Sequence, residues 1–231
     1  MERLILWDID RTLITMAGSS VGYFERAFTA TTGLALEILP EFGGRTDRAI
    51  ISGVLELHGV PVTEEAIEAV FTAMTAAALE SEAEMLAVGS ALPGAAAALA
   101  ALATLPAWQT VVTGNIASLA RQKLTLFELV HHIDLEVGGY GSESTDRADI
   151  VRSAWERAAA KYGRAIPGEA VVVVGDTPHD IAGARDNGVN AVGVATGHSS
   201  VEELWAAGAH AVLPSLADTA AVVAAVTGRR P

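Results

Sequence analysis

The sequence predicts an α/β fold: a Rossmann-like, doubly wound parallel sheet core that carries an inserted all-helical domain. Three observations predict this fold. Short apolar runs alternate with segments of helical periodicity along most of the chain. Two of these runs are followed by aspartates: 4–7 at once, and 171–174 after one glycine. In parallel sheets, polar residues at the ends of strands line the edge where ligands bind. Residues 14–88 carry helical patterns and no strand pattern, so they form an insert after the first strand.

The elements of the core follow one another in strict alternation. We expect strands at 3–8, 108–113, 135–137, 171–175, 190–194 and 210–213. We expect helices at about 94–104, 116–127, 147–162, 179–187, 201–207 and 216–226. Alternation of this kind indicates a parallel sheet with right-handed crossover connections.

The insert is expected to hold helices that end near residues 31, 57 and 85. Gly33 fits the stop of the first helix, because glycine readily adopts the left-handed conformation after a helix. Thr46 or Asp47 would cap the second helix, and Thr63 the third. The domain boundaries that follow are 1–13 and 89–231 for the core and 14–88 for the insert.

The composition limits the classes of partner. The net charge of −13 repels nucleic acid and anionic membranes, so neither is expected as a partner. With no cysteine, thiolate nucleophiles and cysteine metal sites are excluded. The chain enters a strand almost at once, and its most apolar helical run, 91–105, is short and interrupted by proline and glycine. We therefore expect a cytoplasmic protein without a signal peptide, as a monomer or homodimer.

Four carboxylates follow the two strands that lead into aspartates. Asp8 and Asp10 come after the first, and Asp176 and Asp180 after the second. A single aspartate at a strand end is commonly only solvated, but two pairs at one sheet edge crowd like charges together. A divalent cation relieves that repulsion, and carboxylate oxygens with phosphate suit Mg2+. The sequence therefore predicts a Mg2+ site formed by these four residues.

Three motifs in this order resemble the haloacid dehalogenase superfamily, in its phosphatase branch near the phosphoglycolate phosphatases. They are Asp-Ile-Asp-Arg-Thr-Leu at 8–13, Val-Thr-Gly-Asn at 112–115 and Val-Gly-Asp-Thr-Pro-His-Asp at 174–180. The resemblance covers nearly the whole chain. It implies that the insert at 14–88 is a cap domain that closes over the active site.

The resemblance also implies a role for each motif residue. Asp8 would be the nucleophile, and Asp10 the general acid/base with a backbone carbonyl on the metal. The hydroxyl of Thr113 and the amide of Gly114 would hold a phosphoryl oxygen, an interaction that the adjoining helix start also favours. Asn115 would bind substrate or, alternatively, cap that helix.

Other motif positions leave alternatives open. Thr12 would fix its loop by a side-chain to backbone hydrogen bond and lie near substrate. The third motif of the family is a Lys or Arg that stabilises the transferring phosphoryl group, and Arg147 fits its order better than Lys123 does. Arg11 stands where the family most often has Gly, and it faces either the substrate or solvent. Arg45 would read a second anionic group or lie on the surface.

The function expected from the resemblance is hydrolysis of a small phosphorylated metabolite, of the phosphoglycolate or sugar-phosphate type. It would proceed with Mg2+ through an aspartyl phosphate. A phosphosugar mutase of the same superfamily and a catalytically weakened phosphate-binding module are the alternatives. Dehalogenation is disfavoured by Asp10, and Schiff-base phosphonate hydrolysis by the absence of lysine from 14–88.

Overall fold

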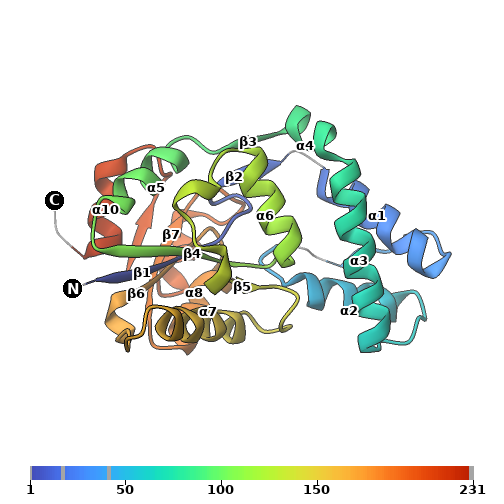
Figure 1. Cartoon of the computed structure of the whole chain (residues 1–231). Helices are drawn as coiled ribbons and strands as arrows, with labels where there is room; N and C mark the ends of the chain where they lie inside the picture. Colours follow the sequence, from blue (N-terminus) through green and yellow to red (C-terminus); the bar gives the residue numbers. More distant parts are fainter. Residues whose placement is uncertain (1, 17–18, 41–42, 229–231) are drawn as a thin grey trace.

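The centre of the molecule is a six-stranded sheet in the order β5-β4-β1-β6-β7-β8 (Figure 1). A computed structural model describes residues 2–16, 19–40 and 43–228. The strands are β1 (Arg3–Trp7), β4 (Ala107–Thr113), β5 (Gly139–Tyr140), β6 (Val171–Gly175), β7 (Asn190–Val194) and β8 (Ala211–Leu213). Every neighbouring pair is parallel, so the predicted α/β fold is confirmed.

Helices cover both faces of this sheet. They are α5 (Ala95–Ala103), α6 (Ala117–Leu126), α7 (Arg147–Lys161), α8 (Pro178–Asp186), α9 (Val201–Ala206) and α10 (Thr219–Thr227). Ile5 and Trp7 of β1 share a core with residues of α5, α6 and α10. Leu4 and Leu6 share the other core with residues of α7, α8 and α9. Successive strand residues point to opposite faces, so a strand buried on both faces is continuously apolar.

The helical insert has a core of its own. It contains α1 (Ser19–Thr32), α2 (Asp47–Leu57), α3 (Glu64–Glu80) and α4 (Glu82–Val88). Buried side chains of these helices pack together with Ile116 and Leu119 near the start of α6. The insert therefore rests on the sheet domain close to the segment between β4 and α6.

Two expectations for the insert are wrong. A short strand, β2 (Ile14–Met16), pairs antiparallel with β3 (Gly89–Ala91), so both ends of the insert are tied together. The long third helix is interrupted at Ser81, whose hydroxyl donates to Ala77 O at 2.6 Å and accepts a hydrogen bond from Arg26. Hydrogen bonding of a serine to nearby backbone competes with helix continuation, which accounts for the break.

The expected strand at 135–137 is also wrong. Leu135–Val137 forms a turn of 3-10 helix, and Asp134 caps it by accepting a hydrogen bond from Glu136 N. The strand β5 begins later, at Gly139, where a Cβ atom would lie 2.1 Å from Ile150 O. This close approach requires glycine, so the chain pairs with β4 only from that residue.

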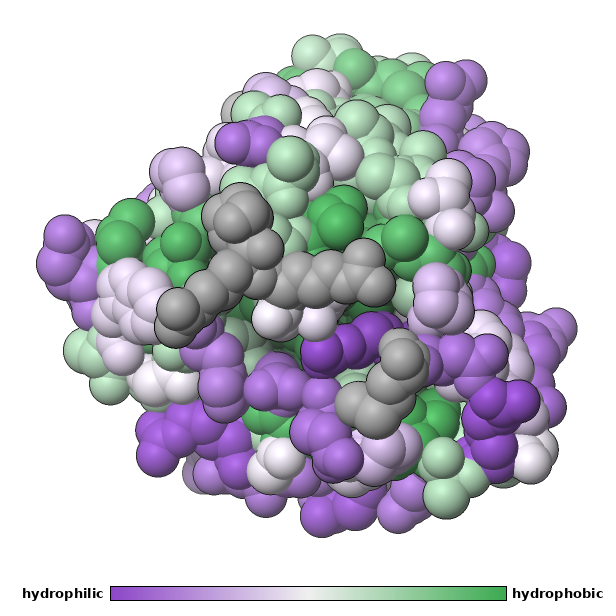
Figure 2. Space-filling model, turned by 90° about the vertical axis from the view of Figure 1, so that its left-hand side faces the viewer, coloured by the Kyte–Doolittle hydropathy of each residue, from purple (hydrophilic) through white to green (hydrophobic). Residues whose placement is uncertain are grey.

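At the end of the molecule where the termini lie, the upper part of the surface is more hydrophobic than the lower part, although hydrophilic residues also line its right-hand edge (Figure 2). Figure 2 shows hydrophobic residues gathered in the upper half, where Figure 1 places α5 and α10, and hydrophilic residues below, toward α7. The exposed positions of α5 are alanines, which accounts for that colour. No helix among residues 2–16, 19–40 and 43–228 has the length and apolar content needed to cross a membrane.

Candidate active site

Three carboxylates meet where β1 and β6 end. Asp8 directly follows β1, and its N–H donates to Val174 O at 2.8 Å. Asp176 follows β6, and Asp180 lies in the first turn of α8. One oxygen atom from each carboxylate lies within 4.8 Å of the others, and all three residues are buried. The structure thus brings together three of the four expected metal ligands at the edge where parallel sheets bind ligands.

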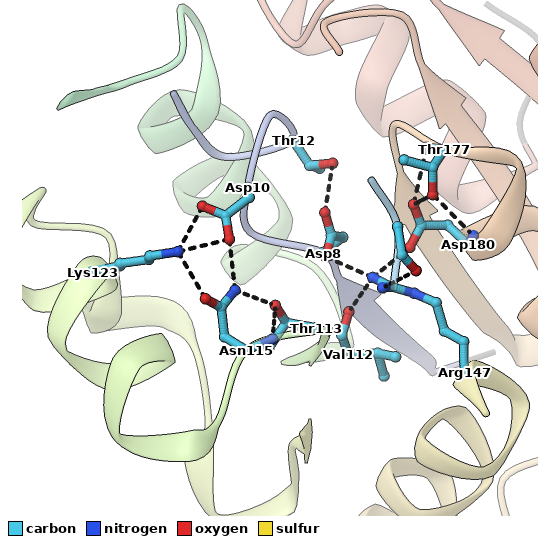
Figure 3. A network of polar contacts seen from close by, with 11 residues as sticks. Asp8, Asp10, Thr12, Val112, Thr113, Asn115, Lys123, Arg147, Thr177 and Asp180 are labelled. Carbon is cyan, nitrogen blue, oxygen red and sulfur yellow. Dashed lines mark hydrogen bonds and ion pairs between the residues drawn. The ribbon is translucent and has the colours of Figure 1, made fainter. Parts of the chain in front are cut away.

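Asp8 lies at the centre of a polar network (Figure 3). Arg147 Nη2 donates to Asp8 Oδ1 at 2.7 Å, and Thr12 Oγ1 donates to Asp8 Oδ2 at 3.4 Å. The expectation that Thr12 bonds to the backbone is therefore wrong. Burial raises the pKa of Asp8 well above its ordinary value, and the charge of Asp180 adds to this against the opposing charge of Arg147.

Arg147 begins α7 and reaches two of the three carboxylates. Its Nη2 atom also lies 2.6 Å from Asp180 Oδ1, and its Nη1 atom donates to Gly44 O at 3.2 Å. A guanidinium beside the expected nucleophile can hold phosphoryl oxygens, since it offers several donors in one plane. Among the described contacts, Lys123 reaches neither Asp8 nor Asp180. The geometry therefore fits Arg147 to the third motif, which stays a prediction.

The charge balance of the cluster fits a divalent cation. Three carboxylates lie beside the guanidinium of Arg147. Burial together with the charge of Asp180 raises the pKa of Asp176 to about 7, although the charges of Arg147 and Arg11 oppose the shift. Asp180 Oδ1 is buried and accepts no hydrogen bond from the residues that the structure describes, although it forms the ion pair with Arg147. A hard cation such as Mg2+ would relieve this crowding with the oxygen ligands that it prefers.

Asp180 also organises the start of α8. Its Oδ2 atom accepts hydrogen bonds from Thr177 N at 3.0 Å and Thr177 Oγ1 at 2.7 Å, and its own N–H donates to Thr177 Oγ1. This reciprocal capping box fixes the carboxylate, since both groups satisfy free N–H groups of the helix start. Asp180 is thus a charge at the start of a helix and a member of the carboxylate cluster at the same time.

Asp10 is turned away from the cluster toward α6 (Figure 3). Lys123 Nζ donates to both of its carboxylate oxygens, at 2.8 and 2.7 Å, and Asn115 Nδ2 donates to Oδ2 at 2.7 Å. Burial alone would raise the pKa of Asp10, but the charge and hydrogen bond of Lys123 outweigh it and lower that pKa. The side chain of Asp10 is therefore no part of the metal cluster, and only its backbone carbonyl is left for the expected metal role.

The loop between β4 and α6 carries the expected phosphoryl-binding groups. Thr113 is fully buried, and its Oγ1 atom accepts hydrogen bonds from Asn115 N and Asn115 Nδ2. The alternative that Asn115 caps α6 is wrong, because its side chain contacts Asp10, Thr113 and Lys123 instead. The cap position belongs to Ile116, whose own side chain makes no capping bond.

A carboxylate from the insert replaces that missing cap. Asp47 Oδ2 accepts a hydrogen bond from Ile116 N at 2.8 Å, and Asp47 N donates to Gly114 O at 2.7 Å. Burial raises the pKa of Asp47 to about 6, although the hydrogen bond from Ile116 opposes the shift. The backbone comes close here, since a Cβ atom on Gly114 would lie 2.3 Å from Arg45 O. The insert is thus docked directly on the expected phosphoryl-binding loop.

Arg45 lines an open groove of about 860 Å³ between α2 and the starts of α7 and α8. Arg147 and His179 line the same groove from the sheet domain. Arg45 is half-buried, and among the described residues its Nη2 atom makes one long contact, of 3.4 Å, to Ala49 O. Its expected substrate role thus stays a prediction, with a large space available beside it.

The sequence predicts the cluster but not two further contributors to the site. Its motif order links Lys123 only to the phosphoryl group, whereas in the structure Lys123 binds Asp10. Its pattern makes Asp47 a possible cap for α2, but Thr46 takes that position by accepting from Ala49 N. Each contact joins residues at least 69 positions apart in the chain, so no local pattern signals it.

The comparisons with known proteins agree with this architecture. A hydrolase from Pseudomonas syringae superposes with a TM-score of 0.67 and 22% identity over 95% of this chain and 96% of its own. A protein from Clostridium acetobutylicum predicted to be a phosphatase has a TM-score of 0.66 and 19% identity, over 96% of this chain and 98% of its own. A protein proposed to be a β-phosphoglucomutase, from Bacteroides vulgatus, has a TM-score of 0.65 and 16% identity, over 98% of this chain and 89% of its own. At these identities the likeness shows the fold alone.

The family assignment comes from the sequence comparison. No curated protein matches the chain. The family described as haloacid dehalogenase-like hydrolase matches residues 5–185, which include Asp8, Asp10, Arg147 and the two acids that follow β6, Asp176 and Asp180. A match over this much of the sequence agrees with the sheet order, the helical insert and the acidic edge. The chain therefore belongs to the haloacid dehalogenase-like hydrolase family.

Proposed function

We propose that this protein is a Mg2+-dependent phosphatase that hydrolyses a small phosphorylated metabolite through an aspartyl phosphate. The observation that carries the proposal is the ion pair between Asp8 and Arg147 inside the three-carboxylate cluster. A buried carboxylate at a strand end, beside a guanidinium, suits attack on a phosphoryl group whose negative charge would otherwise repel it.

The reaction divides into two displacements at phosphorus. In the first, an oxygen of Asp8 bonds to phosphorus as the bond to the leaving oxygen breaks. Asp10, which Lys123 keeps ionised in the free protein, takes up a proton from the phosphate monoester monoanion as it binds and gives that proton to the leaving oxygen. In the second, water attacks the aspartyl phosphate while Asp10 takes a proton from it, which releases inorganic phosphate and restores Asp8. Asp10 keeps 40% of its side chain exposed, so substrate and water can reach it.

Other residues neutralise the phosphoryl group during both displacements. Arg147 donates to its oxygens, together with the hydroxyl of Thr113 and the N–H of Gly114. Asp8, Asp176 and Asp180 would hold Mg2+, which withdraws charge from the phosphoryl oxygens when it is bound. A phosphoglycolate-like or sugar-phosphate substrate carries a second polar or anionic group. Arg45 offers a cation for that group beside the groove.

A phosphosugar mutase is the second candidate, and the fold shared with the protein from Bacteroides vulgatus favours it. A mutase passes the phosphoryl group from Asp8 to another hydroxyl of the sugar instead of to water. Hydrolysis in water labelled with oxygen-18 separates the two, since a phosphatase incorporates the label into inorganic phosphate and a mutase releases none. A binding module would neither release phosphate nor convert the sugar phosphate into its isomer.

The deciding experiment measures phosphate release from a generic aryl phosphate with Mg2+ and with a chelator, beside Asp8→Asn. We expect metal-dependent release that falls by at least about 10³-fold in the variant, because an amide cannot replace the nucleophile. Asp218→Asn is the matched control. Asp218 caps α10 by accepting a hydrogen bond from Ala221 N, and asparagine caps a helix as well as aspartate does. Full turnover by Asp8→Asn would contradict the proposed mechanism.

A further inference from the structure

The two lysines of this chain have opposite environments. Lys161 lies at the end of α7, with its side chain 38% exposed in ion pairs to Asp134 and Glu136. Lys123 is only 1% exposed and lies in the last turn of α6. A buried ammonium is costly unless it is paired, and a buried ion pair adds little stability compared with apolar residues. Stability alone therefore gives no reason for a lysine at this position.

The three N–H donors of Lys123 match three acceptors. Nζ lies 2.8 and 2.7 Å from the two oxygens of Asp10 and 2.7 Å from Asn115 Oδ1. Asn115 in turn donates to Asp10 Oδ2 and to Thr113 Oγ1. Both carboxylate oxygens of Asp10 are thus held from one side, and the same network reaches the hydroxyl expected to bind phosphate (Figure 3).

The two cations divide the two motif acids between them. Arg147 contacts Asp8, and Lys123 contacts Asp10. Within the described part of the chain, Lys123 makes no hydrogen bond or ion pair to Asp8, Asp176 or Asp180. Lys123 therefore lies away from the phosphoryl site, and any effect that it has on the reaction passes through Asp10.

We propose that Lys123 is a positioning residue, which fixes the carboxyl group of Asp10 for proton transfer to the leaving oxygen. The inference rests on the proposed phosphatase function. The side chain of Asp10 is partly exposed, so without Lys123 it rotates toward solvent and loses its distance to the leaving group. Proton transfer depends steeply on that distance. Lys123 itself touches no substrate and exchanges no proton.

The test compares two esters that differ in how much they need the proton. An alkyl phosphate requires protonation of its leaving oxygen, whereas a 4-nitrophenyl phosphate does not. For Lys123→Met we expect kcat/KM on the alkyl ester to fall about 100-fold, within the range of general acid catalysis, and on the aryl ester to fall less than about 5-fold. kcat/KM is the right quantity, because it excludes hydrolysis of the aspartyl phosphate.

Three further variants fix the interpretation. Asp10→Asn should show the same difference between esters, and adding Lys123→Met to it should cause no further loss, as expected for residues that act through one another. Lys161→Met is the matched control, and it should leave both values unchanged. An equal loss on both esters would overturn the proposal and place Lys123 on the phosphoryl group. No loss on either ester would also overturn the proposal and would show that the ion pair between Lys123 and Asp10 is only structural.

A measurement that needs no turnover tests the pairing of Lys123 with Asp10 even if the variants lose activity. With 15N-lysine, the chain gives only two Nζ signals, and Lys123→Met identifies one of them. Asp10→Asn should shift the Lys123 signal and leave the Lys161 signal in place, and an unshifted Lys123 signal would overturn the pairing. If the unsubstituted protein releases phosphate from neither ester, the proposed function fails, while this signal still decides whether Lys123 holds Asp10.

Discussion

Arg11 adopts a left-handed backbone conformation, with φ of 63°, next to the expected general acid/base. Its N–H donates to Ile14 O at 2.6 Å, and its carbonyl accepts from Thr196 Oγ1. A residue with a Cβ atom pays about 1 kcal/mol or more for this conformation, whereas glycine adopts it freely. The backbone thus explains why glycine is usual here in the family that the sequence resembles.

The strain at Arg11 predicts that glycine is more stable than alanine at this position, the opposite of their order within a helix. We expect Arg11→Gly to be more stable than Arg11→Ala by about 1 kcal/mol, because only alanine retains the steric cost. Urea unfolding of both variants measures the difference. Arg121 is the control, since it is exposed within helix α6, where alanine should be the more stable by about 1 kcal/mol. The same order at both positions would contradict the explanation.

The acids of the site show how far a sequence predicts individual contacts. Asp8 and Asp176 could be brought together in advance, because each ends a strand and parallel strands share an edge. The partner of Asp10 could not be predicted in this way. Lys123 lies 113 positions along the chain, on a helix whose rotation about its axis decides whether the ammonium faces the site or solvent. That rotation is set by packing of α6 against α3, which no local pattern encodes.

At the scale of elements, the start of α2 is the part of the insert that meets the catalytic loops. Asp47 N and Arg48 N donate to Gly114 O and Gly141 O, at 2.7 and 2.9 Å. Arg48 Nε also donates to Ser142 O at 2.6 Å. Backbone contacts this close require residues without side chains in the opposing loops. The positions of the substrate-side loop and of the phosphoryl-binding loop are therefore coupled.

This coupling predicts that Gly114→Ala displaces the insert. The new methyl group would lie 2.3 Å from Arg45 O, so the loop before α2 must move away. We expect a loss of about 1–3 kcal/mol in the free energy of unfolding, the usual cost of overpacking, and at least a 10-fold loss in kcat/KM. Denaturant unfolding and phosphatase assays measure the two effects.

Gly22→Ala provides the control for a glycine with room around it. Gly22 lies within α1, and the contacts of a new Cβ there begin at an ordinary 3.5 Å. Alanine should stabilise that helix by about 0.5–1 kcal/mol and leave kcat/KM near its original value. If Gly114→Ala behaved like Gly22→Ala, the insert would not be docked on this loop in solution.

At the scale of the whole molecule, the alternation of elements predicted most of the sheet. Long runs such as β1 and β6 are buried on both faces and therefore stand out as apolar. The misses are the short strands β2, β3 and β5, of two or three residues each. Such lengths hold too little of a period-two pattern to be recognised, and their pairing is decided by the turn or close contact beside them.

The acidic edge joins stability, metal binding and pH in one prediction. Burial raises the pKa of Asp176 to about 7 and that of Asp8 well above its ordinary value of 3.8. A carboxyl whose pKa is raised in the folded state binds its proton more tightly there than when unfolded. Its contribution to stability is complete below the unfolded pKa and is lost as pH rises through the folded one. The metal-free protein should thus lose this contribution between about pH 4 and pH 7.

Mg2+ should reverse that loss, because it binds the ionised carboxylates in place of the protons. At 100 times its Kd, the metal should add about 2.7 kcal/mol at pH 8 and far less at pH 5. Thermal unfolding with Mg2+ and with chelator, at constant ionic strength, measures the difference. Asp47, whose pKa is raised to about 6, titrates in the same window but lies outside the cluster, so it cancels in that difference. Asp176→Asn should remove most of the Mg2+ effect, and an effect of equal size at pH 5 and pH 8 would show that Mg2+ acts elsewhere.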